Sequence, residues 1–515
     1  MSGLAYFTGF SSDTKRPGFV AEVVHGAGPI TFASQPLYLL LVGGMSSGTA
    51  TPDVTVADIR SPDDADTYFG AGSELACMCY AALSKPGIKV NIKALAVADG
   101  TTPVAATATL TVTGSWSTTG TLIVDLDGGN YAGGARLSID VSASDTVSTL
   151  AAKIAAAVQA KTRLFCSGAS NLGVATLTVK TEGPRGNDHA CYVDQSLLPS
   201  GCVVTLTGGT AMTSQGTTLL GKRFTGGSVA RDVTNALAVL LPGEYDNAVF
   251  SDNDATNAAL IKAWVLARAA AGAQRYTTTV FAHNGSYSTP ASLASTTLND
   301  VRESALWMYE GESHGSVIAA SMAAIKQESD QEHPNRSFDG VKLWGVAPQR
   351  FTAQRPTGGS TGQIETALQN GVSPIDTIGG EAVMTRFITT RCLNGSASDY
   401  RTMDVGSAKT PDRTSQRWAF QWAYTVQPAN PYVADDPEEG DPDARDETLT
   451  PKDYADILNE DLATLEREHW VTDVANNQAT VLFNATGKHL VATAPIIPAY
   501  INHRVGVSIR NVTAA

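Results

Sequence analysis

Hydrophobic and polar positions along the first hundred residues alternate between strand-like and helix-like periods. A fully apolar run at 36–42 is typical of a buried strand. Residues 62–84 carry apolar side chains at roughly helical spacing, and a Lys-Pro-Gly break follows at 85–87. Residues 88–97 then alternate as a strand. This order of elements predicts the first part of an α/β core.

From 89 to 225 the composition changes, and Thr, Gly and Val dominate. Strand-like segments separated by Gly, Asn and Ser turns recur at 107–112, 121–126, 136–141, 174–180 and 203–207. One helix is predicted at 145–159, with Leu150, Ile154 and Val158 on one face. The segment is typical of a β-rich domain inserted into the core.

After residue 226 strands and helices alternate again. Strands are expected at 245–250, 276–282 and 341–346, and helices at 254–271, 298–308 and 317–325. Strands alternating with helices of this length predict a layered α/β domain.

The last quarter of the chain begins with an acidic segment, 435–447, which holds eight acids in thirteen positions and is expected to be a solvated loop. A helix is predicted at 450–469, because Thr450 can cap it, Pro451 suits its first position and Asp453 follows three residues after the cap. Its apolar face is formed by Tyr454, Ile457, Leu458, Leu462 and Leu465.

These patterns predict a multidomain α/β protein with a layered α/β core, an inserted β-rich domain and a C-terminal α+β domain with extended terminal arms. The expected boundaries are 1–28 for an N-terminal arm, 29–88 for the first part of the core, 89–225 for the insertion, 226–390 for the main core and 391–515 for the C-terminal domain.

Charge and composition exclude several function classes. The net charge is −14, and no basic run exceeds two residues, so neither nucleic-acid binding nor attachment to anionic lipid is expected. Charged residues make up 17% of the chain, against ~25% in typical soluble domains. A surface with few charges favours a protein largely covered by copies of itself, although an ordinary uncharged surface would have the same composition.

The six cysteines form no CxxC pair, which fits a reducing cytoplasm. The N-terminus has no signal-peptide pattern, and the longest apolar run, Leu75–Leu83, is far below the ~20 residues that span a bilayer. We therefore expect a chain made and kept in the cytoplasm unless lysis releases it. The eight histidines are scattered, so no metal site and no cofactor are expected.

The strongest signal for catalysis is Ser313, within a G-x-S-x-G pattern that precedes a predicted helix. A nucleophile elbow needs a strand before this serine, whereas the segment before it is predicted to be helical. The same pattern recurs at Ser46 and Ser360, so chance matches are common in this chain. A serine hydrolase remains an alternative, and the histidines available to complete a triad are His333, His469, His489 and His503.

One segment, TALQNGVSPIDTIGGEAVMTRFITTRC at 366–392, resembles the core of contractile tail sheath proteins of bacteriophages. That family repeats L-x-x-G-[IV]-x-P-[IL], followed by G-[EG]-x-V-x-x-R-x-I-T-T. Four further segments resemble sheath motifs in the expected order, although Ser337 stands where a second proline is usual: 16–19, 182–187, 245–250 and 334–346. The nearest group is the Mu-like sheath, with a core labelled subtilisin-like, but the protease's Gly-Thr-Ser motif is absent and no catalysis is implied.

The resemblance implies a structural subunit without catalytic, cofactor or metal residues. Such subunits form hexameric rings that stack helically around an inner tail tube and contract, which drives the tube through the host envelope for genome delivery. The implied partners are copies of the chain, the inner tube protein, and the baseplate and tail terminator proteins. The implied location is the tail sheath of the virion, assembled in the host cytoplasm. A sheath of an R-type bacteriocin or of a phage-derived injection device is the alternative.

The resemblance also implies that terminal arms add strands to the sheets of neighbouring subunits. The candidate arm residues are Phe19, Val20, Val23, Val24, Val505, Val507 and Ile509. The alternative is that both segments are ordinary edge strands within one subunit.

Sheath proteins further carry a helix near the C-terminus that faces the tube, and the helix at 450–469 matches it by position. Its acidic side could meet basic residues of the tube through weak ion pairs, or could simply face solvent. The candidate residues are Asp453, Asp456, Glu460, Asp461 and Glu466. The nearly neutral insertion would lie on the outside of the sheath.

Overall fold

The computed structural model of the protein describes residues 35–270, 273–351, 363–399, 401–429, 432–436, 448–484 and 489–499. Every helix and strand named below belongs to the compact unit that begins at Pro36. As the sequence predicts, this unit combines helices with several separate sheets and belongs to the α/β class.

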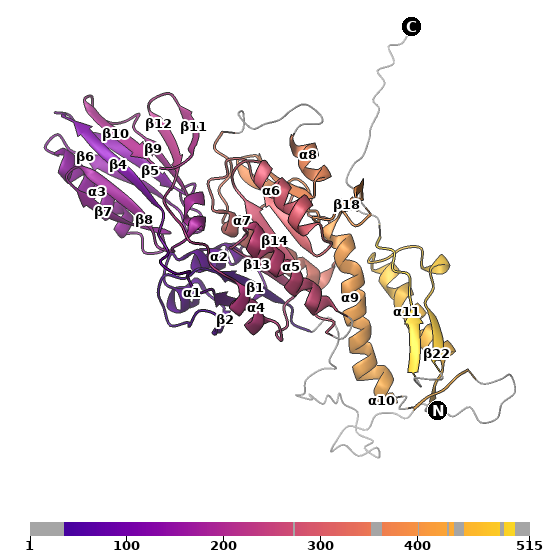
Figure 1. Ribbon diagram of the computed structural model, residues 1–515. Helices are drawn as coiled ribbons and strands as arrows, with labels where there is room; N and C mark the ends of the chain where they lie inside the picture. The colour runs from indigo at the N-terminus through magenta and orange to yellow at the C-terminus, as the bar shows by residue number, and fades with distance from the viewer. Residues whose placement is uncertain are drawn as a thin grey trace, which may run out of the picture. The chain divides into compact units, whose positions relative to one another are not determined.

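The core is an eight-stranded sheet with the order β17-β16-β15-β14-β13-β1-β3-β2 (Figure 1). Neighbours from β3 to β16 pair in parallel, whereas β2 and β17 pair antiparallel at the two edges. The strands are β1 (Tyr38–Gly43), β2 (Val56–Ile59), β3 (Asn91–Ala96), β13 (Asn247–Phe250), β14 (Thr278–His283), β15 (Glu303–Trp307), β16 (Val372–Ile378) and β17 (Glu381–Met384).

Helices cover both faces of this sheet. Side chains of β1 alternate between two cores, because Leu39 and Leu41 belong to one apolar cluster and Leu40 and Val42 to another. The helices of the first cluster are α2 (Glu74–Ala82) and α7 (Gly315–Glu332), and those of the second are α4 (Thr234–Leu240) and α5 (Ala255–Ala269). A sheet buried on both faces explains the fully apolar strand patterns.

Two predicted elements are wrong for identifiable reasons. The helix expected at 298–308 is replaced by strand β15, whose five residues are all buried, so its apolar run carries no period that separates strand from helix. The strand expected at 341–346 forms only one bridge, Lys342 to Val383. Gly340 and Gly345 take positive φ values of 73° and 72°, which turn the chain out of the extended conformation.

The inserted segment contains two antiparallel sheets, with orders β10-β4-β8-β7 and β11-β12-β9-β5-β6. Their strands start at Thr107, because β3, which the predicted boundary at 89 assigns to the insertion, pairs with β1 in the central sheet. The elements are β4 (Thr107–Gly114), β5 (Gly120–Leu126), β6 (Ala135–Val141), α3 (Val147–Gln159), β7 (Cys166–Asn171), β8 (Val174–Val179), η2 (Pro184–Asp188), β9 (Ala190–Asp194), β10 (Cys202–Thr207), β11 (Ala211–Gln215) and β12 (Leu219–Arg223).

In the C-terminal part, the predicted helix at 450–469 is confirmed as α11 (Pro451–Arg467). The Thr450 side chain accepts from the Asp453 amide at 3.2 Å, and the Asp453 carboxylate accepts from the Thr450 amide at 3.3 Å, which completes a capping box. The other elements here are α9 (Val405–Gln421), the π-helical η6 (Trp422–Val426), α10 (Gln427–Ala429), β20 (Tyr432–Val433), β21 (Thr448–Leu449), η7 (Val474–Asn476), β22 (Thr480–Asn484) and β23 (His489–Thr493).

The remaining elements are short and connect the larger ones. They are α1 (Pro62–Phe69), α6 (Ser288–Ser292), the π-helical η3 (Leu293–Leu298), α8 (Gln363–Gln369), β18 (Leu393–Asn394) and β19 (Ala397–Ser398).

Candidate functional site: two joints at the ends of the central sheet

The insertion and the C-terminal part contact opposite ends of the parallel strands. The insertion contacts residues that follow β14 and β15, whereas α9 contacts residues that precede β13, β14 and β15. We call the first contact region the carboxyl-edge joint and the second the amino-edge joint. Both are built from buried polar side chains, so their geometry decides how the three parts of the chain are connected.

Arg231 lies at the centre of the carboxyl-edge joint. Its Nη1 lies 3.0 Å from Glu74 Oε2 and 3.1 Å from Asp252 Oδ1, and its Nε lies 3.0 Å from Asp99 Oδ1. Its Nη2 also donates to the carbonyl oxygen of Glu182, at 2.8 Å. Burial lowers the pKa of Arg231, but the three carboxylates outweigh it and raise the pKa above its usual value. The guanidinium therefore remains charged and holds the insertion onto the sheet.

Two more arginines cross this joint. Arg223, at the end of β12, donates through Nη2 to the carbonyl oxygens of Asn284 and Gly311, at 2.6 and 2.9 Å. Arg350 donates to both oxygens of Glu312 at 2.8 Å and to Asp125 Oδ2 at 3.1 Å. In each case a planar guanidinium joins groups from the core and from the insertion, which fixes their orientation as well as their separation.

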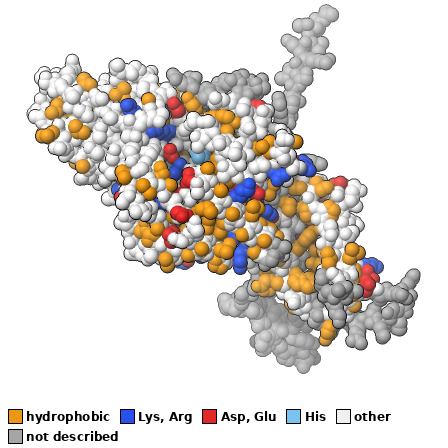
Figure 2. Space-filling model, in the orientation of Figure 1, with side chains coloured by type: hydrophobic (Ala, Val, Ile, Leu, Met, Phe, Trp, Pro, Cys, Tyr) orange, Lys and Arg blue, Asp and Glu red, His pale blue; other side chains and the backbone are white. Residues whose placement is uncertain are grey.

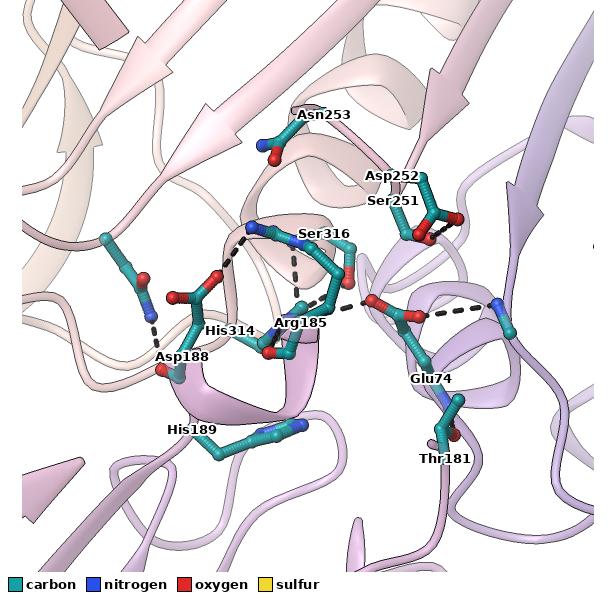
Figure 3. A network of polar contacts seen from close by, with 12 residues as sticks. Glu74, Thr181, Arg185, Asp188, His189, Ser251, Asp252, Asn253, His314 and Ser316 are labelled. Atoms are coloured by element: carbon teal, nitrogen blue, oxygen red, sulfur yellow. Dashed lines mark hydrogen bonds and ion pairs between the residues drawn. The ribbon is translucent and has the colours of Figure 1, made fainter. Parts of the chain in front are cut away.

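A pair of stacked histidines lies beside Arg185 in this joint (Figure 3). The rings of His189 and His314 are 4.5 Å apart, and His189 Nδ1 lies 2.6 Å from Asp127 Oδ2. His314 Nε2 lies 3.0 Å from the carbonyl oxygen of Arg185, and its Nδ1 accepts from the Ser316 amide at 3.3 Å. Burial, then His189 and Arg185, lower the pKa of His314 to about 3, so this ring is neutral at neutral pH.

Enzymes with open parallel sheets bind their ligands in the crevice at this same edge. Here a cavity of about 290 Å³ remains, lined in part by Arg185, Asp188, His283 and Asn284. Arg185 and Asp188 pair with each other at 2.5 Å, and Asn284 donates to the carbonyl oxygens of Asp188 and Ser313. Figure 2 shows acidic, basic and histidine side chains gathered in a hollow of the surface. These polar groups thus mainly satisfy one another.

Ser313 has the chain context of a nucleophile elbow without its geometry. Contrary to the predicted helix, strand β15 precedes it and α7 follows. However, Ser313 is 1% exposed, and its Oγ accepts from the Ala347 amide at 2.8 Å. His333 and His469 lie instead near α11, where His333 Nε2 contacts the Glu468 carbonyl oxygen. This geometry does not support a serine nucleophile.

At the amino-edge joint α9 crosses the starts of three strands. Lys409 Nζ donates to the carbonyl oxygens of Asp246 and Tyr276, at 3.1 and 3.3 Å, and Arg302 forms a two-bond ion pair with Asp412 at 2.8 and 2.6 Å. Burial, then the neighbouring positive charge of Lys326, lowers the pKa of Lys409 to about 8. The first half of α9 is therefore fixed to the sheet.

The acidic residues proposed to face a tube do not all lie on one exposed surface. Asp456 and Glu460 are exposed, and Asp453 is exposed but engaged in the helix cap. Glu466 is half-buried and accepts from the Val474 amide at 3.2 Å. Asp461 is 8% exposed and is bound by Arg417 and Trp418 of α9. The prediction that Asp461 belongs to the outward face is therefore wrong.

The hairpin of β22 and β23 is a two-stranded sheet. Leu482 on β22 is 71% exposed and Val491 on β23 is 45% exposed. Among the described residues, the edges of this hairpin pair with no other strand. Such a hairpin, with exposed apolar side chains, is poorly stabilised alone and offers a template for another strand. The predicted arm residues, in contrast, lie outside the described part of the chain: Phe19, Val20, Val23, Val24, Val505, Val507 and Ile509.

No helix in the described ranges is long and apolar enough to cross a bilayer. Within the same ranges, no group of three or more His, Cys, Asp or Glu side chains is placed to hold a metal ion. All six cysteines are free and buried. On the face shown in Figure 2 charged side chains are sparse, as the composition predicts.

Several solved structures similar to this chain are sheath proteins. The sheath tail protein of Desulfitobacterium hafniense is 12% identical with a TM-score of 0.45, over 93% of this chain and 100% of that one. The sheath tail protein Lin1278 of Listeria innocua is 13% identical with a TM-score of 0.47, over 91% and 93%. The contracted sheath of the anti-feeding prophage is 10% identical with a TM-score of 0.38, over 57% and 78%.

No protein-family model and no curated protein matches the chain. These TM-scores lie below 0.5, so the likeness to these structures does not by itself define a function. The assignment to the Mu-like sheath group stays a prediction.

Two of the sheath-like motifs contribute contacts between parts of the molecule. Arg386, from the R-x-I-T-T motif, pairs with Asp404 at the start of α9 at 3.0 Å. Thr389 Oγ1 in the same motif donates to the Thr402 carbonyl oxygen at 2.8 Å. At the carboxyl-edge joint, the motif at 182–187 supplies the Glu182 carbonyl oxygen that binds Arg231. The motif at 16–19 lies outside the described residues.

Sequence reasoning missed most of the residues that hold the joints, including Arg231, Arg417 and Asn335. Their partners lie far away along the chain, so no local pattern marks them. Asp461 had a signal, because it stands next to Leu462 on the side of α11 that buries Leu458 and Leu465. An acidic residue on an apolar face predicts a buried partner of opposite charge.

Proposed function

We propose that this chain is the structural subunit of a contractile tail sheath. The observation that carries the proposal is the ordered set of sheath motifs, two of which supply contacts between parts of the chain, Arg386 with Asp404 and Glu182 with Arg231. In this function the chain forms hexameric rings that stack helically around an inner tube, and contraction drives the tube through an envelope. A helical stack requires a heterologous contact that does not close on itself.

Each part of the chain has a role in this proposal. The core and the insertion act as one rigid body, with the insertion (predicted at 89–225) on the outside. Asp456 and Glu460 on α11 face the inner tube protein, since they are exposed carboxylates on one side of the helix. Baseplate and tail terminator proteins bind the ends of the stack, and the sheath assembles in the host cytoplasm as part of a virion.

Polymerisation depends on strand addition in this proposal. The terminal arms of one subunit pair with the open edges of the β22–β23 hairpin of a neighbour, and they cover Leu482 and Val491, which are 71% and 45% exposed. The backbone hydrogen bonds of such pairing persist while the subunit bodies move, so the lattice remains connected during contraction.

Electron microscopy of the purified protein at rising concentration and salt tests the proposal. We expect long hollow tubes with regular striations. Deleting residues 1–24 or 503–515 is expected to leave a folded monomer that does not polymerise. Uniform small particles under every condition, or normal tubes from both truncated proteins, would contradict the model.

A substitution in the hairpin separates strand addition from general loss of solubility. Leu482→Glu places a charge where an added strand must pack, so we expect the length of tubes to fall sharply. Leu197→Glu is the matched control, because Leu197 is 60% exposed on the insertion and should not change assembly. Equal effects of the two substitutions would argue against the hairpin as the acceptor.

The same sheath could belong to an R-type bacteriocin or to a phage-derived injection device. The genes beside the coding sequence distinguish these cases, because capsid and terminase genes accompany only a complete phage.

A further inference from the structure

The contact between α9 and α11 centres on the carboxylate of Asp461. Arg417 Nε and Nη2 lie 2.9 and 2.6 Å from Asp461 Oδ1, and Trp418 Nε1 donates to Oδ2 at 2.9 Å. Asp461 is 8% exposed, and the Arg417 side chain is 24% exposed. Two donors from consecutive residues therefore hold one carboxylate in a single orientation.

The two helices that meet at this carboxylate are anchored to different elements. The first half of α9 is fixed to the central sheet through Lys409 and through Asp412. In contrast, α11 packs on β22 and η7, and Asn459 exchanges two hydrogen bonds with the backbone of Ala479, at 2.7 and 3.3 Å. We call α11, η7, β22 and β23 the C-terminal module.

Within the described residues, other contacts between this module and the rest of the chain lie towards the ends of α11. The rings of Trp422 and Tyr454 meet at 5.4 Å near its start. Beyond its end, Asn335 Nδ2 donates to the carbonyl oxygens of Trp470 and Ala499, at 3.3 and 2.9 Å. The carboxylate of Asp461 is thus the charged contact in the middle of the helix.

We propose that Asp461 is a positioning residue, which sets the direction of the exposed face of α11 relative to the central sheet. Asp456 and Glu460 lie on that face, and Glu460 is adjacent to Asp461, so a rotation of α11 about its axis redirects both carboxylates. Released from Arg417 and Trp418, the C-terminal module turns about its end contacts. This inference rests on the proposed function, in which that face meets the inner tube.

Spin labels on the purified full-length chain measure this direction. Ala463→Cys places one label on the exposed side of α11, and Leu266→Cys places the other on α5, where Leu266 is 46% exposed. The six native thiols are buried and do not compete for the label. With Asp461 intact we expect one narrow distance distribution. With Asp461→Asn, the width should at least double, while the circular dichroism of the protein stays the same.

Matched variants keep the proposal falsifiable. Asp456→Asn removes an exposed carboxylate from the same helix and should leave the distribution narrow. Trp418→Phe retains the ion pair and removes one donor, so an intermediate width is expected. A distribution as narrow in Asp461→Asn as in the parent protein would overturn the proposal. Absence of tubes in electron microscopy would instead contradict the sheath function and leave this measurement valid.

Discussion

The carboxyl-edge joint and the contact between α9 and α11 are built from similar side chains but differ in what surrounds them. At the carboxyl-edge joint, Arg231 is 3% exposed, and one apolar cluster continues from α2 and α7 into the sheets of the insertion. Between α9 and α11, the Arg417 side chain is 24% exposed, and α11 packs mainly on its own hairpin.

This difference indicates which parts of the chain move together. Charges inside a continuous apolar core cannot separate without exposing that core, so the insertion and the sheet form one body. Polar contacts at a partly exposed joint are replaced by water at lower cost, so the C-terminal module can change its orientation without unfolding. A contractile subunit needs both properties.

The largest expected effect is at Arg231. Arg231→Met leaves Glu74 and Asp252 buried without their cation, which costs about 3–5 kcal/mol of the free energy of unfolding. Urea denaturation measures this loss. Arg401→Met is the control, because the Arg401 side chain is 77% exposed and Asp399 keeps its contact with Arg391 when Arg401 is replaced. Similar small losses for both variants would show that the carboxyl-edge joint is no more rigid than the surface.

Raising the pH is expected to lower the free energy of unfolding through Glu303, the first residue of β15. This carboxyl is fully buried, and neither of its oxygens has a hydrogen-bond partner among the described residues. Burial, then Asp300, raises its pKa from 4.5 to about 8. The folded protein therefore retains a proton that the unfolded chain releases, so stability is highest below the unfolded pKa and falls as the pH rises towards the folded pKa.

Glu303→Gln should remove this dependence. Between about pH 5 and about pH 7, the variant should gain about 2–3 kcal/mol relative to the parent protein, at about 1.4 kcal/mol per pH unit. Urea denaturation at the two pH values gives the difference. If the gain is the same at both values, Glu303 is not protonated in the folded protein.

Lowering the pH is expected to lower the free energy of unfolding through His283, the last residue of β14. Burial, then Arg185, lowers its pKa from 6.5 to about 4. Its contribution to stability is complete above the unfolded pKa and is lost as the pH falls towards the folded pKa, because only the unfolded chain binds the proton. His283→Gln should reduce the loss between about pH 6 and about pH 5 by about 1 kcal/mol. An unchanged slope would assign the acid sensitivity to other groups, such as His314.

Much of the fold could be predicted because its signals are local. The cap of α11 at Thr450 and the apolar run of β1 are both patterns within a few residues, and both elements formed as expected. The failure at β15 has the opposite cause, since all five of its residues are buried, and the order of its polar and apolar residues therefore does not show a strand period. The boundary at residue 89 failed because a change of composition does not show that β3 pairs with β1.

By itself, the sequence determined the α/β class, most helices and strands, the low surface charge and the ordered motifs that resemble a sheath. These properties depend on neighbouring residues, on total composition or on the order of short segments. Only the tertiary structure decided that Asp461 faces Arg417, that Ser313 is buried against Ala347 and that Arg231 joins three carboxylates. Asp461 and Arg417 are 44 positions apart, and Ser313 and Ala347 are 34 apart. Arg231 lies 21 positions from Asp252 and 157 from Glu74. Only the folded chain brings these residues together.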